Sequence, residues 1–355
     1  MPRVLVAGWV GSTNLGDELV FAALHAKLAG RGAAVAVVSV DPAATSAAHG
    51  VAALDHRDLP GLIAAAGQAD GVVFGGGGLL QDETSPLNLP YHLSRVAVAR
   101  GRRTPFAAVG VGAGRLDTRL GRLLVRRGLR GAVAVSARDG DSARLLEAVG
   151  VHDVGVAADL VLGLPTPAAA PADQLVVCLR PWSAGRKRLP AGLRGDATPD
   201  AVVAAVAHAL DQAAHATGLA VRFVALQRDR DDALHRRVAE RMDATVTTAA
   251  PDLDGVLGEI AAARAVVAMR YHAGIGAVLA ARPCVLIGYA PKVDALAGEL
   301  GAGGALLAWD QRDLGGLARA VDAVSGHDAA VATARDRLRA RDRVNDAALD
   351  RLLDR

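Results

Sequence analysis

The stretch VLVAGWVGSTNLGDELVFAALHAKLA, residues 4–29, holds the structural unit that recurs along the chain. Its apolar run over residues 4–9 predicts a buried strand, a glycine-rich polar turn follows, and residues 17–29 have the apolar spacing of a helix. Strands that are apolar on both faces and alternate with helices are typical of a parallel sheet covered on both sides. The stretch therefore predicts the first βα unit of an α/β fold.

The same alternation continues in two halves of the chain. In the first half it predicts strands at residues 35–40, 71–74, 106–111 and 133–136, and helices at 59–66, 89–100 and 116–129. In the second half it predicts strands at 175–179, 221–226, 245–248, 265–269 and 284–287, and helices at 201–216, 231–242, 253–263 and 274–281. Residues 163–173 contain three prolines and no periodicity, which indicates a linker. We expect two Rossmann-like domains that face a cleft, over residues 1–165 and 174–326, followed by a charged helix over 327–355.

Composition excludes several classes of protein. The 355 residues are 52% hydrophobic, enough for two domains with sizeable cores, and the net charge of +3 permits anionic substrates without requiring them. Aromatic residues make up only 3%, too few for the stacking platforms of single-strand nucleic-acid binding. Cys178 and Cys284 lie in apolar runs, which predicts buried thiols in a reducing compartment. Without a signal-peptide pattern or a long uncharged apolar segment, we expect a cytoplasmic protein, and a peripheral contact with the inner face of the membrane stays open.

The polar residues of interest follow predicted strands, where open α/β sheets bind their ligands. After the first strand, Asn14, Gly16 and Asp17 lie in a turn that differs from dinucleotide and Walker motifs. They could bind sugar hydroxyls, or only cap the next helix. After the strand at 71–74, Gly75 is followed by Gly76, Gly77 and Gly78. Four glycines suit a concavity for an anionic or polyhydroxy ligand, and the alternative is a flexible turn.

The second half carries a cationic set at its predicted strand ends. Arg270 and His272 follow the strand at 265–269 and precede a helix, whose N-terminal N–H groups favour anions. A guanidinium and an imidazole there suit a small polyanion, although a buried histidine is more often a core residue. Arg180 ends the strand at 175–179, and Lys292 follows the strand at 284–287. Asp231, near the start of a predicted helix, is expected to cap it.

Six motifs in this order resemble the polysaccharide pyruvyl transferase family, most closely its bacterial cell-wall branch of the CsaB type. They lie at residues 14–18, 75–78, 180–182, 227–231, 270–273 and 289–294, and the resemblance extends over about residues 4–300. It implies a fold similar to the two-domain GT-B arrangement of glycosyltransferases. It also implies transfer of a pyruvyl group from phosphoenolpyruvate to two hydroxyls of one sugar, which gives a cyclic ketal. In the cell-wall branch that sugar is an N-acetylmannosamine unit of a polymer that anchors S-layer proteins, modified while lipid-linked.

The resemblance also implies that Arg180, Arg270 and His272 hold phosphoenolpyruvate. From their positions in the sequence we add Lys292 and Tyr271, which stands in place of the family's usual leucine. The chemistry then predicts His272 as the general acid, or as a donor to the departing phosphate, and Asp17 as the base toward a sugar hydroxyl. We expect the acceptor to bind at Asn14, Gly16, Asp17, Gly76, Gly77 and Gly78. No metal or organic cofactor is required by this scheme. Two alternatives stay open: a GT-B glycosyltransferase that uses a nucleotide sugar, and a non-catalytic protein that binds a glycan or phosphate.

Overall fold

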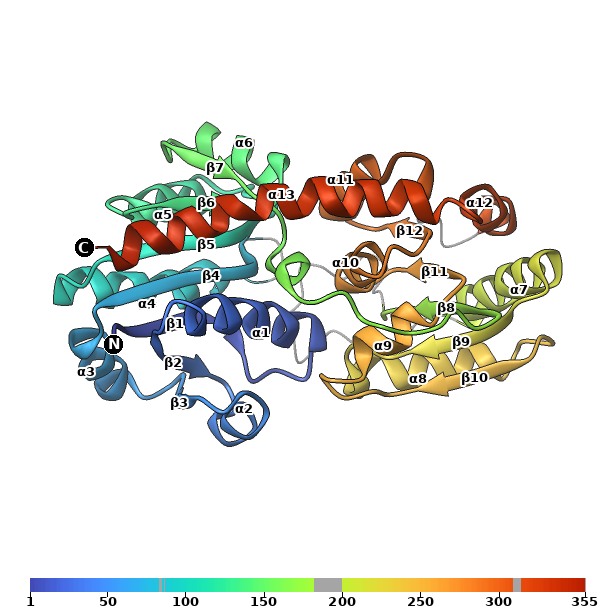
Figure 1. Ribbon diagram of the computed structural model, residues 1–355, viewed down its shortest axis with the longest axis horizontal. Helices are drawn as coiled ribbons and strands as arrows, with labels where there is room; N and C mark the ends of the chain where they lie inside the picture. Colours follow the sequence, from blue (N-terminus) through green and yellow to red (C-terminus); the bar gives the residue numbers. More distant parts are fainter. Residues whose placement is uncertain (83–84, 86, 182–199, 309–313, 355) are drawn as a thin grey trace. The chain divides into compact units, whose positions relative to one another are not determined.

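The computed structural model describes residues 1–82, 85, 87–181, 200–308 and 314–354, and these form two compact units. Unit 1 consists of Met1–Ser12, Asp17–Leu164 and Leu338–Arg355, and unit 2 of Thr13–Gly16 and Pro165–Arg337. Each unit is built on one parallel sheet whose strands alternate along the chain with helices (Figure 1). The predicted α/β fold with two Rossmann-like parts is therefore confirmed.

Unit 1 contains a seven-stranded parallel sheet with the order β3-β2-β1-β4-β5-β6-β7. Its strands are β1 (Arg3–Val10), β2 (Ala34–Ser39), β3 (Ala52–Asp55), β4 (Gly71–Leu80), β5 (Phe106–Ala113), β6 (Val135–Ala137) and β7 (Val154–Val156). Its helices are α1 (Leu15–Ala29), α2 (Pro42–His49), α3 (Leu59–Gln68), α4 (Asn88–Arg102), α5 (Arg119–Leu129), α6 (Gly140–Ala148) and the 3₁₀ turn η1 (Leu160–Gly163). The strand order reverses between β1 and β4, and open α/β sheets bind ligands at such a reversal.

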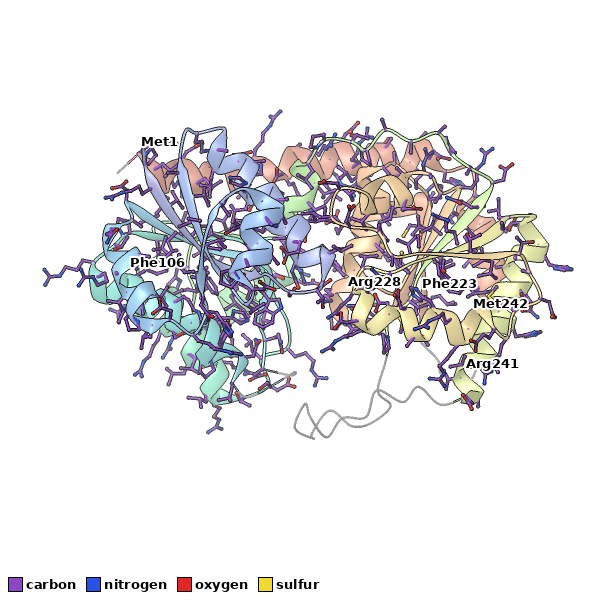
Figure 2. All side chains as sticks on the ribbon, turned by 90° about the horizontal axis from the view of Figure 1, so that it is seen from below. Met1, Phe106, Phe223, Arg228, Arg241 and Met242 are labelled. Atoms are coloured by element: carbon purple, nitrogen blue, oxygen red, sulfur yellow. The ribbon has the colours of Figure 1, made fainter. Side chains whose placement is uncertain are left out.

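The sheet of unit 1 is buried on both faces. On one face, side chains such as Leu5, Phe74 and Phe106 pack against α3, α4, α5 and α6; Phe106 is labelled in Figure 2. Several of these helices begin where local sequence provides a cap: the side chains of Asp58, Thr118 and Asp139 each accept a backbone N–H at the start of α3, α5 and α6. Apolar strands and capped helices thus explain why this part of the chain follows the predicted alternation.

Unit 2 contains a six-stranded parallel sheet with the order β10-β9-β8-β11-β12-β13. Its strands are β8 (Gln174–Cys178), β9 (Ala220–Val224), β10 (Val246–Ala249), β11 (Ala265–Ala268), β12 (Cys284–Gly288) and β13 (Gly304–Ala308). Its helices are α7 (Asp200–Thr217), α8 (Arg228–Ala239), α9 (Val256–Ala261), α10 (Tyr271–Leu279), α11 (Pro291–Leu300), the 3₁₀ turn η3 (Gly301–Gly303) and α12 (Leu317–Val324), with the start of α13 (Asp328–Leu353). Here the order reverses between β8 and β11.

The buried core of unit 2 holds its central strands in register with one another. Val177 of β8, Val267 of β11 and Val285 of β12 are paired neighbours in the sheet, and all three are fully buried. Phe223 of β9 joins them in the core that packs under α7, α8 and α12 (Figure 2). Because these strands are in register, residues that follow them emerge at the same edge of the sheet.

Some elements were not predicted, and one glycine motif was assigned to the wrong structure. Strands β3 and β13 are short, partly exposed edge strands, so they lack the continuous apolar run that marks a buried strand. The glycines at 75–78 are not a loop after the strand: β4 continues through them to Leu80, and Gly75 and Gly77 pair with β5. Glycine runs predict turns, but here close packing of neighbouring elements requires residues without a Cβ.

Two segments lie in a different unit from the one that the predicted limits gave. Residues 13–16 belong to unit 2, because the N–H of Leu15 donates to the carbonyl of Leu226 over 2.8 Å and Asn14 forms a β-bridge with Gln227. The charged helix at 327–355 is not separate either. Helix α13 begins in unit 2, and from Leu338 onward it belongs to unit 1.

The charges on α13 are paired within unit 1. Lys27 of α1 lies 2.6 Å from Asp342 and 3.1 Å from Asp346, and Arg31 pairs with Asp346 and Asp350. Asp342 is almost fully buried. Burial raises the pKa of Asp342, and hydrogen bonds from Lys27 and Asn345 act against that rise. The acidic residues of the predicted charged helix thus bind it to α1.

We expect Lys27→Met to lower the free energy of unfolding by about 1–3 kcal/mol at neutral pH, because Asp342 would remain buried without its cation. A raised folded-state pKa adds stability that is present below the unfolded value of 3.8 and lost as the pH rises through the folded value. The loss in Lys27→Met should thus shrink as the pH falls and Asp342 takes up a proton. Urea unfolding at several pH values measures this, and a loss independent of pH would contradict it.

Both cysteines are in the core, as predicted. Cys178 and Cys284 are fully buried free thiols. Burial raises the pKa of Cys178, and it raises the pKa of Cys284 to about 12. Neither thiol is therefore a nucleophile at neutral pH. Over the described ranges of the chain, no helix is both long and apolar enough to cross a membrane.

Candidate functional site

The reversal of strand order in unit 2 brings three groups of polar side chains together. Ala268 of β11 pairs with Cys178 of β8 on one side and with Leu286 of β12 on the other. Arg180 and Arg270 each come two residues after these paired positions, and the N–H groups of Met269 and Arg270 both donate to the carbonyl of Cys178. The two arginines predicted to bind the donor therefore emerge side by side.

Arg270 is held by a carboxylate whose role the sequence analysis did not find. Its Nε and Nη2 both donate to Asp231, the first over 3.0 Å, in a two-pronged ion pair. Asp231 is fully buried and also accepts the N–H of Gln227 over 2.9 Å. It is not the N-cap of α8, which is Gln227, but it binds the backbone of that residue and also fixes Arg270. Among the described residues Nη1 of Arg270 has no hydrogen-bond partner, so this nitrogen is the one that can donate to a ligand.

A second cation is held by a tyrosine. Nη1 of Arg180 donates to the hydroxyl of Tyr289 over 3.0 Å, and its guanidinium lies 4.8 Å from the centre of that ring. Lys292, in the first turn of α11, lies 5.6 Å from the ring of Tyr271 and 6.0 Å from that of Tyr289. Tyr271 thus contributes its side chain to the cationic cluster and not its backbone alone. The cluster brings together Arg180, Arg270, Tyr271, Tyr289 and Lys292.

His272 lies in the first turn of α10, beside Tyr271, with ring centres 5.3 Å apart. The helix begins at Tyr271, three residues earlier than predicted. His272 is 8% exposed, and a Cβ on Gly16 would lie only 2.2 Å from its Nδ1. Gly16 is therefore glycine because the imidazole packs directly against its backbone. Asn14 closes the same turn, since its side chain accepts the N–H of Gly16 over 3.2 Å.

Side chains are excluded at some glycines of β4 by close packing and at others by backbone conformation. A Cβ on Gly75 would lie 2.1 Å from the carbonyl of Val109, and one on Gly76 would lie 2.2 Å from Val20, so packing alone excludes side chains at both. Gly76 and Gly77 also have positive φ values of 77° and 84°. A Cβ on Gly77 would lie 3.5 Å from Oδ1 of the half-buried Asp17. The predicted acceptor-binding residues of unit 1 are thus adjacent at the reversal between β1 and β4.

Sequence reasoning assigned no role to two polar residues of unit 1. Glu18 accepts the N–H groups of Gly11 and Ser12 and lies 3.0 Å from His49, so it fixes the turn that follows β1. Arg138 follows β6 and is buried; a Cβ on Gly112 would lie 2.5 Å from its guanidinium carbon. A cation directly after a strand was the signal for Arg138. Glu18 lies in the motif at residues 14–18, but no sequence pattern indicated its partners, which are the backbone N–H groups and His49.

The cations around Tyr289 change its acidity. Burial alone would raise the pKa of its phenol, but Lys292, Arg180 and Arg270 outweigh that effect and lower the pKa to about 8. Because the hydroxyl oxygen accepts from Arg180, its own proton points elsewhere and can be donated to a ligand. A lowered folded-state pKa adds stability above the unfolded value of 10 and loses it as the pH falls through about 8.

We expect the tyrosinate absorbance of the protein to show an ionisation at about pH 8 that disappears in Tyr289→Phe. The matched control is Tyr91→Phe, because burial raises the pKa of Tyr91 and its loss should leave this transition unchanged. An anion bound to the neighbouring cations should move the transition to higher pH. A spectrophotometric titration measures both effects, and a transition that persists in Tyr289→Phe would contradict the assignment.

The described part of the chain has no group of three or more His, Cys, Asp or Glu side chains arranged to hold a metal ion. Trp182, part of one of the motifs quoted above, lies outside the described residues. Unit 2 thus carries a cationic cluster with His272 and the turn at residues 14–16, and unit 1 carries Asp17 with the β4 glycines. An acid or hydrogen-bond donor beside several cations can bind an anionic donor, and a carboxylate can deprotonate an alcohol.

Comparisons with known proteins bear on this site and on the fold. A family model described as polysaccharide pyruvyl transferase matches residues 14–291, which include every candidate site residue except Lys292. No curated protein matches the chain.

Solved structures resemble the chain over nearly its whole length. Alr3699/HepE from Anabaena in complex with UDP-glucose has a TM-score of 0.62 at 14% identity and covers 100% of both chains. UDP-GlcNAc 2-epimerase from Neisseria meningitidis bound to UDP-GlcNAc has a TM-score of 0.60 at 10% identity, with 99% of this chain and 100% of that chain covered. MnaA from S. aureus with UDP has a TM-score of 0.55 at 12% identity, with 98% and 91% covered. At such low identities the likeness shows the fold alone, which is of the GT-B type.

Proposed function

Because this chain belongs to the polysaccharide pyruvyl transferase family, we propose that it transfers the pyruvyl group of phosphoenolpyruvate to two hydroxyls of one glycan sugar. The product is a cyclic ketal, and phosphate is released. The observation that carries the proposal is the cluster of Arg180, Arg270 and Lys292 with His272 at neighbouring strand ends of unit 2. A small molecule with two anionic groups fits several fixed cations better than a neutral ligand does.

The donor carries a phosphate and a carboxylate, and each needs a cationic partner. Arg180 and Arg270 supply two guanidinium groups that are held by different residues, Tyr289 and Asp231. Preorganised cations of this kind lose little freedom when they bind. Since Asp231 offsets the charge of Arg270, we assign the hydrogen bond from Nη1 of Arg270 to one anionic group and the net charge of Arg180 and Lys292 to the other.

The chemistry requires a proton at the methylene carbon of the donor, which makes the neighbouring carbon electrophilic. One sugar hydroxyl adds to that carbon, and the other displaces the phosphate to close the ring. We assign the proton donation to His272, because an imidazole is the side chain that most often serves as a general acid or base. Tyr289 can hydrogen-bond to the same donor.

The acceptor sugar is assigned to the turn at residues 14–16 and to Asp17, Gly76, Gly77 and Gly78. Asp17 is proposed as the group that takes the proton from the sugar hydroxyl.

The acceptor is proposed to be an N-acetylmannosamine unit of a lipid-linked cell-wall polymer that serves in S-layer anchoring. The reaction would then take place in the cytoplasm, at the inner face of the membrane. The mildly basic charge of the chain agrees with a surface that carries anionic lipids. Phosphoenolpyruvate is the donor substrate, and the scheme needs no other cofactor.

A glycosyltransferase that uses a nucleotide sugar is the second candidate, because the similar structures named above hold UDP or UDP-sugars. A non-catalytic protein that clamps a glycan or a phosphate is the third. The cationic cluster favours a small polyanion over a nucleotide sugar. A nucleotide sugar also carries a base, and no described residue of the cluster has an amide or carboxylate group that could hydrogen-bond to a base.

Turnover separates these candidates. The full-length protein is incubated with phosphoenolpyruvate and either a lipid-linked or a soluble N-acetylmannosamine acceptor, and phosphate release is followed together with the mass of the glycan. We expect phosphate release only when both substrates are present, with a pyruvyl ketal added to the acceptor. No release with any acceptor, together with hydrolysis of UDP-glucose, would overturn the proposal.

A further inference from the structure

Unit 1 holds an exposed indole that none of the assigned roles uses. Trp9, near the end of β1, is 37% exposed, whereas most large apolar side chains of unit 1 are buried. Aromatic residues make up only 3% of the chain, so an exposed tryptophan beside the reversal of strand order stands out. Single exposed apolar residues are common on protein surfaces, and the case for a ligand rests on what surrounds this one.

The indole is fixed from behind by a layer of rings. Tyr91 and His92 of α4 meet it edge to face, with ring centres 5.8 Å and 5.9 Å away. Tyr91 is itself held, because its hydroxyl lies 2.9 Å from Nδ1 of His56 and the guanidinium of Arg95 lies 3.6 Å from its ring centre. A ring that is already immobile loses little entropy when a ligand stacks on it.

His92 adds no charge to the ring layer behind the indole. Burial, with a smaller effect of Arg95, lowers the pKa of His92 to about 4, so its imidazole is neutral at physiological pH. Trp9 also lines a small hollow together with Asp17, Gly75 and Gly76. The charged group of this hollow is thus a carboxylate, in contrast to the cations of unit 2, and it disfavours phosphates and other anions.

A flat apolar face beside a carboxylate matches a sugar ring. Such a ring presents C–H groups on its face and hydroxyls on its edge, and the hydroxyls can donate to Asp17 while the face lies on the indole. The geometry points to Trp9 as a stacking platform for a neutral pyranose ring, held in place by Tyr91 and His92. This inference rests on the proposed function, since it assigns the ring to the glycan acceptor and makes Trp9 a determinant of acceptor recognition.

The test uses Trp9 as its own reporter. The chain has three tryptophans, so W182F combined with W309F leaves Trp9 as the single indole of the full-length protein. We expect its fluorescence to change when a soluble N-acetylmannosamine oligosaccharide is added, and not when inorganic phosphate or phosphoenolpyruvate is added. An unchanged signal with the oligosaccharide at saturation overturns the inference, and so does an equal response to UDP, which would mean that the indole stacks on a base.

Kinetics give the second measurement. Trp9→Ala should raise the KM for the acceptor about tenfold or more, the effect expected for one lost stacking contact, and leave the KM for phosphoenolpyruvate unchanged. Trp9→Phe should retain most of the affinity. Leu120→Ala is the matched control, since Leu120 is a 64% exposed apolar residue of the same unit. Equal KM values for Trp9→Ala and the parent overturn the inference while the proposed function stands. A Trp9 response to glycan without any phosphate release supports the platform and defeats the proposed function.

Discussion

Arg270→Ala is expected to abolish measurable binding of phosphoenolpyruvate and to lower the free energy of unfolding by about 3–5 kcal/mol. Both effects follow from its pair with Asp231. The carboxylate is fully buried, and its partners are the guanidinium and the N–H of Gln227. Without Arg270, a charge stays in the core with one backbone hydrogen bond to compensate it, and the donor loses the Nη1 nitrogen.

The two effects can be separated with a second variant. In Asp231→Ala combined with Arg270→Ala, no buried charge remains, so stability should recover in part while donor binding stays absent. Arg222→Ala is the matched control, because Arg222 makes a two-pronged pair with Glu259 that is partly exposed. It should change stability by about 1 kcal/mol or less and leave donor binding intact.

Urea unfolding and calorimetric titration with phosphoenolpyruvate measure these quantities. If donor affinity were unchanged in Arg270→Ala, Arg270 would serve only to hold Asp231 and α8, and its assignment to the donor would be wrong. If the double variant were no more stable than Arg270→Ala, the buried carboxylate would not be the source of the loss.

His272→Ala should lower turnover by about 10²–10⁴-fold, the typical contribution of a general acid. Affinity for the donor should fall much less, because the arginines remain. His272→Gln keeps the size and hydrogen bonding of the side chain but cannot supply the proton, so it should be impaired to the same extent. His208→Ala serves as control, since His208 is an exposed residue of α7 in the same unit.

Gly16→Ala tests the role of His272 by displacing its imidazole. A methyl group at that position would come within 2.2 Å of Nδ1 of His272, so the imidazole or the turn must shift. We expect turnover to fall while the donor affinity stays close to that of the parent. Steady-state rates and the KM of each substrate measure the effects of both variants. If donor affinity and rate fell together in His272→Ala, the imidazole would be a phosphate ligand and not the acid.

The sequence predicted elements well where one local pattern decided them. The apolar runs at β1, β8, β11 and β12 and the periodic helices α1, α4 and α7 appear where predicted, because a strand buried on both faces cannot contain polar residues. Edge strands such as β3 were missed, since one side of them meets solvent and their composition is mixed. The glycines of β4 were predicted as a loop, because the need for close packing on Val20 and Val109 comes from other parts of the chain.

Within the site, the sequence by itself determined which polar residues follow strands, and so it gave Arg180, Arg270, His272, Lys292 and Asp17 as candidates. Only the tertiary structure decided what holds each of them. Asp231 lies 39 residues before Arg270, and Tyr289 lies 109 residues after Arg180, so no local pattern joins either pair. The same holds for the contact between Gly16 and His272, and for the ring layer behind Trp9. Strand order and register create these neighbours, and register is set by the packing of the whole sheet.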